Sequence, residues 1–315
     1  MEKKQDLTKL LRQFGLLFVI LAIVIIMSIV SPVFLKPQNI INIIRQVSIN
    51  GIIAVGMTCV ILTGGIDLSV GSVVAITSVI CGSFLAMGIN WFVACISGVA
   101  ISILFGLFNG YMISYVRFQP FIATLASMAI GRGIALAYSN GKPYPIKDPS
   151  FIAIGQGSFL GIPIPIILLV IVVAVGLITL KMTTFGRYIF AIGGNENAAK
   201  LSGVRTRRVK LAVYVISAIC ASIVGLILSA RISSGQPTAG ESYEMDAIAA
   251  TAIGGTSMNG GLGSLVGTIE GFILLGLMTN SMNLLNINSF YQQIAKGLLI
   301  VVAVFLDMKS KGSEN

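Results

Sequence analysis

Long apolar runs separated by short polar segments dominate the chain. Nine of these runs hold few charged residues, and each has the roughly 17 to 25 residues that a helix needs to cross about 30 Å of hydrocarbon. A shorter apolar stretch, MDAIAATAIGG at 245–255, cannot span the bilayer unaided, and we interpret it as a tenth, partial or broken helix. The pattern therefore predicts an all-α, polytopic membrane protein with about ten transmembrane helices. The nine long runs lie near residues 14–34, 46–63, 68–87, 92–116, 119–138, 163–180, 209–231, 263–286 and 289–307.

Composition supports this prediction and excludes other classes. The 315 residues are 56% hydrophobic and 10% charged, and the mean hydropathy is +0.95, so one water-soluble globule could not bury the apolar side chains. We treat residues 1–315 as a single transmembrane domain. The chain has no histidine, and its four cysteines fall inside apolar runs without close CxxC spacing. We therefore expect no metal site, no disulfide framework and no cofactor.

The net charge of +10 predicts an orientation in the membrane. The cations gather in loops beside apolar runs, as the positive-inside rule describes, so we do not expect nucleic-acid binding. Three segments are basic: the N-terminus, the loop 181–210 and the C-terminal tail with Lys309 and Lys311. Placing all three in the cytoplasm requires six spans before the loop and an even number after it. Ten helices satisfy this condition, and the segment 140–165 then becomes an outward-facing interfacial loop.

The first apolar run could be mistaken for a signal peptide. No small-x-small cleavage pattern follows it, so we expect a retained first span. The cations that precede this run are Lys3, Lys4, Lys9 and Arg12.

One part of the basic loop has the pattern of a short helix. An asparagine can cap its start, a glutamate suits the positive end of the helix dipole, small apolar residues form one side, and a glycine can end it. Such a rigid segment could dock into a cleft of a soluble partner, while the cations after it hold the loop at an anionic membrane surface. An undocked basic loop is the alternative. The residues of the segment are Asn195, Glu196, Ala198, Ala199, Leu201 and Gly203.

Two similar stretches contain glycine pairs that we expect to break helices. They are TGGIDLSVGS at 63–72 and NGGLGSLVGT at 259–268. In the first, Asp67 can accept hydrogen bonds from the amides of Ser69 and Val70 and so cap the next helix. Transporters often bind substrate near paired helix breaks, so Asp67 is either a helix cap or a pathway residue. The glycine pairs are Gly64 with Gly65 and Gly260 with Gly261.

Polar side chains inside the apolar runs are further candidates. A stripe of small residues every four positions in the fourth run predicts close helix packing. Six polar residues are candidates for a transport pathway, although Asn109 and Asp67 also suit structural hydrogen bonding. The stripe is Gly98, Ser102, Gly106 and Gly110. The pathway candidates are Gln46, Ser48, Asn50, Asp67, Asn109 and Thr124.

Ionisable residues within membrane runs are costly unless they face protein or water, so each is a functional candidate. Arg132, Glu270 and Lys296 fall in this class. From the assumed helix directions, Glu270 and Lys296 lie toward opposite membrane surfaces and should not pair. Asp246 opens the short helix, and we expect it to meet Arg132 near the outer surface.

Five separated motifs, in order, resemble the permease subunit of bacterial ribose-type ABC importers. The resemblance runs from about residue 15 to the C-terminus, and Glu270 departs from it because a small or apolar residue usually occupies that position. The motifs are NIIRQVSINGIIAVGMTCVILTGGIDLSVGS, QPFIATLASMAIGRG, GRYIFAIGGNENAAKLSGV, SSGQPTAGESYEMDAIAATAIGGTSMNGGLGSLVGT and NLLNINSFYQQIAKGLLIVVAVFLD.

The resemblance implies a function and partners. The chain would form the path for a monosaccharide, with ribose first, across the bacterial inner membrane. A sugar-binding protein would deliver the sugar from outside, and two permease copies would enclose the path. The segment from Glu196 to Gly203 loosely matches the family's ATPase-coupling motif. The chain lacks G-x-x-x-x-G-K-[ST], so a separate cytoplasmic ATPase would supply the energy and the chain itself would not be an enzyme.

Two other classes stay open on the residues alone. A proton-coupled sugar transporter would use a carboxylate in the membrane, for which Glu270 and Asp67 are the support. A membrane scaffold without transport activity explains the spans and leaves the polar residues at membrane depth unexplained.

Overall fold

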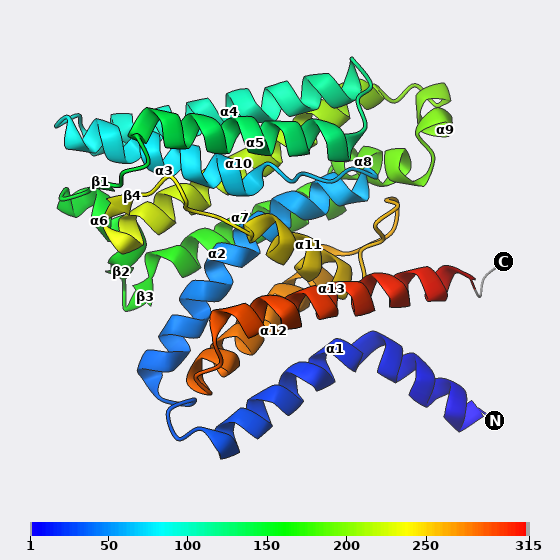
Figure 1. Ribbon diagram of the computed structural model, residues 1–315. Helices are drawn as coiled ribbons and strands as arrows, with labels where there is room; N and C mark the ends of the chain where they lie inside the picture. The colour runs from blue at the N-terminus through cyan, green and yellow to red at the C-terminus, as the bar shows by residue number, and fades with distance from the viewer. Residues whose placement is uncertain (1, 313–315) are drawn as a thin grey trace.

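The computed structural model describes residues 2–312 and is built mainly of helices (Figure 1). For residues 2–14, 303, 304 and 306–312 only the helical backbone is described. The helices are α1 (Glu2–Val30), α2 (Pro37–Leu62), α3 (Val70–Ala86), α4 (Trp91–Ser114), α5 (Pro120–Ser139), α6 (Pro149–Gln156), α7 (Ile164–Met182), α8 (Thr184–Gly194), α9 (Glu196–Leu201), α10 (Thr206–Ile232), α11 (Tyr243–Ile253), α12 (Leu265–Leu284) and α13 (Ser289–Gly312). The strands are β1 (Tyr144–Pro145), β2 (Ser158–Phe159), β3 (Ile162–Pro163) and β4 (Ser234–Gly235), paired antiparallel as β1 with β4 and β2 with β3.

The predicted apolar runs correspond to helices. In the described part of the chain, 6 helices are long and apolar enough to cross a membrane, namely α2, α4, α5, α7, α10 and α12. Shorter apolar helices lie at Gly15–Val30 and Val70–Ala86. The segment 140–165 is more ordered than a plain loop, since it holds α6 and the β2–β3 hairpin. The four cysteines are free thiols in this structure.

The small-residue stripe of α4 lies against α10 and α3, as its spacing predicts. A Cβ on Gly106 would lie 2.8 Å from the Cα of Val215, and one on Gly110 would lie 2.8 Å from the Cα of Leu211. The Ser102 hydroxyl forms a hydrogen bond of 2.7 Å with the Thr77 hydroxyl of α3. Small side chains therefore let these helices approach closely through van der Waals contact.

An irregular segment that contains turns runs along α3 between β4 and α11. Gly235 lies against Gly82 near the end of α3, the amide of Gln236 donates to the Ser78 hydroxyl (2.9 Å), and the carbonyl of Gly240 lies against Gly71 at its start. Figure 1 shows this segment passing from the end of the molecule that holds β4 toward its middle, where α11 begins. Irregular backbone inside a membrane protein is tolerated when protein surrounds it or when it lines a cavity.

The two ends of the molecule differ. In Figure 1, the beginning of α1, the end of α13 and helix α9 lie at one end, while α6 and the strands lie at the opposite end. The basic residues near the termini that matter for orientation have side chains outside the described part of the chain. These residues are Lys3, Lys4, Lys9, Arg12, Lys309 and Lys311.

Candidate functional site

Helix α9 projects from one end of the bundle and is capped as its sequence predicts. The side-chain oxygen of Asn195 accepts a hydrogen bond of 3.0 Å from the amide of Ala198. The helix ends where Gly203 adopts a φ of +86°, a conformation that favours glycine. Glu196 in the first turn forms an ion pair with Lys210 of α10. This pair and the two ends of the helix fix α9 relative to α10.

The apolar side expected for α9 is divided between two surfaces. Ala199 is buried, with 4% exposure, and packs among apolar side chains of α8 and α10. Ala198 is exposed, and Leu201 is 89% exposed at the outer side of the helix. Ala199 therefore belongs to the protein's own core, whereas Leu201 presents apolar surface away from the rest of the chain.

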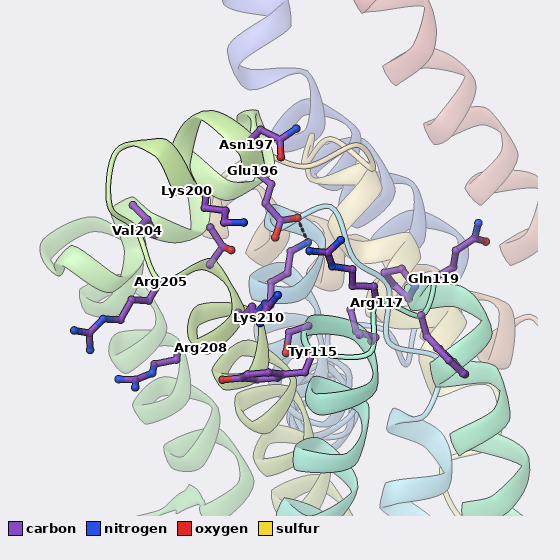
Figure 2. Close-up of a pocket in the computed structure, with 16 residues that line it drawn as sticks. Tyr115, Arg117, Gln119, Glu196, Asn197, Lys200, Val204, Arg205, Arg208 and Lys210 are labelled. Atoms are coloured by element: carbon purple, nitrogen blue, oxygen red, sulfur yellow. Dashed lines mark hydrogen bonds and ion pairs between the residues drawn. The ribbon is translucent and has the colours of Figure 1, made fainter.

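A basic cavity of about 900 Å³ opens beside α9. It lies between α9, the start of α10 and the connection from α4 to α5, and Figure 2 shows Glu196 and Lys210 joined within it. The guanidinium of Arg207 lies 5.7 Å from the ring centroid of Tyr115, within reach of a cation–π interaction. Such an excess of cations attracts anionic groups. The cations that line the cavity are Arg117, Lys200, Arg205, Arg207, Arg208 and Lys210.

The first glycine break is held by a buried network centred on Asp67. One carboxylate oxygen accepts hydrogen bonds from the amide (3.0 Å) and the hydroxyl (2.6 Å) of Ser69. The other accepts one from the Ser217 hydroxyl of α10 at 2.8 Å. The amide group of Asn109 donates to the Ser69 hydroxyl at 2.8 Å. The expected bond from Ser69 is present, but Val70 contributes none, because the carboxylate is turned toward α10 instead.

Thr124 of α5 contacts the same break beside this network. Its hydroxyl lies 2.8 Å from the carbonyl oxygen of Pro120 and 3.3 Å from that of Ile66. Asp67, Asn109 and Thr124 are each no more than 1% exposed. None of the cavities described in this structure is lined by these three residues. Their observed contacts hold the break between α2 and α3 in place.

The second glycine pair lies within the connection between α11 and α12. Helix α11 ends at Ile253, earlier than Gly260 and Gly261, so these glycines do not themselves break the helix as expected. The next helix does open on a small polar residue, since the Ser264 hydroxyl accepts from the amide of Val266 at 3.2 Å.

Three glycine-containing segments meet by backbone contact at this point. The amide of Gly261 donates to the carbonyl oxygen of Leu62 at 3.0 Å. A Cβ on Gly260, which has a φ of +85°, would lie 2.6 Å from the amide nitrogen of Gly64. A Cβ on Gly193, in the last turn of α8, would collide with the carbonyl oxygen of Leu62 and with Gly261. The end of α2, the end of α8 and the α11–α12 connection therefore form one junction, directly before α9. We call it the glycine junction.

The intramembrane charges pair differently from the expectation. The ammonium of Lys296 on α13 lies 2.9 Å from the Asp246 carboxylate, and the amide group of Asn50 lies 3.5 Å from the same carboxylate. Arg132 instead donates to the carbonyl oxygens of Pro237 (2.7 Å) and Ala239 (3.0 Å). The predicted pair of Asp246 with Arg132 is wrong because the irregular segment between β4 and α11 carries Asp246 past Arg132, and the guanidinium donates to backbone carbonyls of that segment.

The other polar candidates on α2 and α12 stand apart from these networks. The Ser48 hydroxyl donates to the carbonyl of Ile44 in its own helix at 2.7 Å. Gln46 and Glu270 are half-buried, and neither forms a hydrogen bond or ion pair with the described residues. As expected, Glu270 does not meet Lys296.

Comparison with known proteins identifies the family. Residues 39–304 match the permease component of the branched-chain amino acid transport system family. The chain belongs to this permease family. It is 45% identical over 310 residues to the ribose import permease protein RbsC of Bacillus subtilis, covering 98% of this chain and 96% of that protein. It is 46% identical over 300 residues to RbsC of Haemophilus influenzae (94% and 92% covered) and 38% identical over 295 residues to the L-arabinose transport system permease protein AraH of Escherichia coli (94% and 90% covered). No solved structure shows significant similarity to the chain.

Family membership makes the permease a multi-pass membrane protein of a transport system, in a family of transport components and not of enzymes. It also implies an ATPase and a solute-binding protein as partners. Two features of the permease were not found from its sequence. The glycine junction joins residues far apart in the chain, and Arg117 enters the basic cavity through a connection outside the basic loop. The sequence holds only a weak local indication that Arg117 lines the cavity. Arg117 lies in a connection of five residues between α4 and α5, where it adopts a positive φ of 68°.

Proposed function

We propose that the chain is the membrane-spanning permease subunit of an ABC importer and forms the pathway for a monosaccharide, with ribose as the first candidate. The observation that carries this proposal is the 45% identity over nearly the full length of a protein named as a ribose import permease. The likeness to an L-arabinose permease supports a sugar as the wider substrate class.

The arrangement of the helices supports ten membrane-crossing elements in a single domain, residues 1–315. Six of them precede α9, namely α1 to α5 and α7, and four follow it, namely α10 to α13. With α9 in the cytoplasm, this count places both termini in the cytoplasm as well. The beginning of α1 and the end of α13 lie at the same end of the molecule as α9, which supports this orientation in a bacterial inner membrane (Figure 1).

Helix α9 is proposed to dock into a cleft of the ATPase. The cap at Asn195 and the ion pair between Glu196 and Lys210 make α9 rigid. The exposed side chain of Leu201 offers the ATPase an apolar contact. The ATPase would move α9, and α8 would carry this motion to the glycine junction. Because Gly193 touches both Leu62 and Gly261, a shift of α8 reaches α2 and α12 without flexible side chains between them.

The remaining parts of the importer would come from other chains. The permease has no phosphate-binding loop, so we propose no enzymatic activity and no cofactor for it. A sugar-binding protein would dock at the end that carries α6 and the strands. A second copy of the permease would complete the pathway, and the bilayer, not a nucleic acid, would surround it.

A proton-coupled sugar transporter is the second candidate function. The observation that favours it is Glu270, a half-buried carboxylate within α12 that has no hydrogen-bond partner among the described residues. Asp67 favours it less, because three donors already occupy its carboxylate.

The proposed function is tested by uptake of radiolabelled ribose. The permease is expressed in a host without ribose import, together with the ATPase and the sugar-binding protein encoded in the same genome. We expect ribose uptake that needs all three proteins. Uptake that persists without the ATPase would contradict the proposal, and so would absence of ribose uptake with all three proteins assembled in the membrane.

A further inference from the structure

A cavity of about 580 Å³, lined by both polar and apolar residues, lies between the start of α11 and the first half of α13. This volume falls within the range of about 300 to 1,000 Å³ that small-molecule sites occupy. The cavity differs from the apolar groove between α2, α7 and α12, whose lining is entirely aliphatic and aromatic. Its polar lining consists of Glu241, Ser242, Tyr243, Asp246, Ser289, Gln292, Gln293 and Lys296.

The path of the irregular segment between β4 and α11 sets the depth of this cavity. Gly235 lies beside Gly82 of α3, and Gly240 lies beside Gly71, eleven residues earlier in the same helix. At 1.5 Å per helical residue, the segment has descended by about 16 Å when it reaches Glu241. That distance is close to half of the roughly 30 Å hydrocarbon thickness. The cavity therefore reaches from the first residue of α13, Ser289, to about this depth, beside the start of the discontinuous helix α11. Transporters commonly hold their substrates near such helix breaks.

The exposed residues of the cavity could not face lipid at this depth. The side chains of Glu241, Ser242 and Gln293 are exposed, and an ionisable or amide group in contact with hydrocarbon is costly. The neighbouring face of α13 is different, because Phe290 and Leu298 expose 74% and 61% of their surface and are apolar. Helix α13 thus has an apolar face suited to lipid or protein, beside a polar edge that requires water or a polar molecule.

The charges in the cavity suit a neutral molecule with many hydroxyl groups. Lys296 and Asp246 neutralise each other at 2.9 Å. The exposed carboxylate of Glu241 is the remaining charge among the described lining residues, so it disfavours an anionic substrate and can accept hydrogen bonds from hydroxyl groups. An ammonium has three donors and a carboxylate has about four acceptor positions, so this pair retains donors and acceptors for further partners. A sugar hydroxyl can donate a hydrogen bond to the carboxylate and can accept one from the ammonium.

The two glutamines at the edge of the cavity have different contacts. Gln292 is buried and donates to the side chain of Asn283 (2.8 Å) and the carbonyl of Ile287 (2.9 Å), which anchors the start of α13. Gln293 is exposed and forms no hydrogen bond with the described residues, so its amide is free for a ligand.

We propose that this cavity is a monosaccharide-contact site within the translocation pathway, in which Asp246, Lys296 and Gln293 exchange hydrogen bonds with the sugar hydroxyls. The inference rests on the proposed function and adds to it the residues that the sugar meets. The mixed donors and acceptors of the cavity allow brief contacts, which suit a molecule that must also leave.

Cysteine labelling tests this assignment in the intact transporter. Cys95 is the partly exposed native cysteine, so Cys95→Ser is the parent. Gln293→Cys is compared with the matched control Leu298→Cys, which lies on the apolar face of the same helix. A membrane-impermeant methanethiosulfonate that carries a sulfonate should react with Gln293→Cys at least about tenfold faster, because a thiol in water ionises far more readily than one in lipid.

Labelling of Gln293→Cys should block ribose uptake, and ribose-loaded binding protein with ATP should slow the labelling. Equal labelling rates at the two cysteines, or normal uptake after full labelling, would overturn the cavity assignment. Protection by leucine and not by ribose would overturn the sugar as its ligand. Before labelling, the Cys95→Ser parent must import ribose with its partners. Failure of that parent, while the unsubstituted permease also fails, would count against the proposed function itself.

Discussion

The amide of Gly261 donates a hydrogen bond of 3.0 Å to the carbonyl oxygen of Leu62, which joins the α11–α12 connection directly to the end of α2. Gly193 of α8 packs against both partners of this bond. Because backbone atoms meet here without intervening side chains, the junction is stiff and leaves no room for a Cβ atom. The glycine junction contains the end of α8, and α9 begins directly after α8. It therefore connects the proposed ATPase contact on α9 to α2 and to the α11–α12 connection.

Gly193→Ala should damage transport, whereas its neighbour Gly194→Ala should not. A Cβ on Gly193 collides with Leu62 and Gly261, whereas one on Gly194 meets no atom within 4 Å. Overpacking of this kind costs about 1 to 3 kcal/mol or displaces the backbone. Ribose uptake at matched membrane levels is the measurement, with thermal unfolding in detergent to report stability. Equal uptake and equal unfolding temperatures for the two variants would show that the junction is not tightly packed.

Leu201→Asp should leave the permease folded and weaken its association with the ATPase. The side chain is 89% exposed, so a carboxylate there costs the isolated permease little. Leu160→Asp, at 86% exposure in the hairpin at the opposite end, is the matched control. Pull-down of the ATPase should decrease for Leu201→Asp alone. Undiminished pull-down and uptake would remove α9 from the ATPase contact.

Ala199→Asp should act differently from Leu201→Asp. Ala199 is 4% exposed within an apolar cluster, so an aspartate there buries an unpaired charge and lowers the amount of folded permease. Fluorescence-detected size-exclusion chromatography measures that amount. If Ala199→Asp folded normally and lost only ATPase binding, Ala199 would face the partner and not the permease core.

Asp67→Ala should be more harmful than Asp67→Asn. Alanine leaves the hydroxyl groups of Ser69 and Ser217 without their buried acceptor, at a cost of about 1 to 3 kcal/mol. An asparagine oxygen can still accept on one side, and the Ser217 hydroxyl can accept from the new amide on the other. Unfolding temperature and ribose uptake should fall together across the two variants. An inactive Asp67→Asn that unfolds at the parental temperature would instead indicate a role for the charge in transport.

Glu270→Gln should retain most of the ribose uptake. Glu270 contacts no hydrogen-bond partner among the described residues, and glutamine keeps its size while it cannot ionise. An ATP-driven importer has no need for a carboxylate that gains and loses a proton in each cycle. Loss of uptake in a stably inserted Glu270→Gln variant, together with loss of uptake under a protonophore at constant ATP, would favour the proton-coupled alternative.

The sequence predicts the helices well where a continuous apolar run forms one membrane-spanning helix. It predicts them less well where a helix carries polar turns or is interrupted within the membrane. Helix α2 begins at Pro37, nine residues before the apolar run at 46–63, because its first turns carry polar residues that hydropathy excludes. The local capping pattern around Asn195 was also readable, since it depends on neighbours in sequence.

Long-range contacts were the part that sequence reasoning missed. The expected pair of Asp246 with Arg132 assumed that α11 starts at the membrane surface, and it fails because the segment after Gly235 descends along α3 first. The glycine junction likewise depends on three segments that meet only in the folded chain. Spacing within one helix, as in the small-residue stripe of α4, predicts a packing face but does not name the partner.

The central claim, that the permease carries a sugar under the control of an ATPase, is tested most directly in proteoliposomes. The purified permease is reconstituted with its ATPase, and the ribose-loaded binding protein is placed on the side opposite to the ATPase. The initial rate of radiolabelled ribose uptake is then measured with ATP, without ATP, and with ATP plus a protonophore. We predict uptake that requires ATP and the binding protein and persists in the protonophore. Uptake driven by a proton gradient alone, with no ATPase in the membrane, would contradict the account.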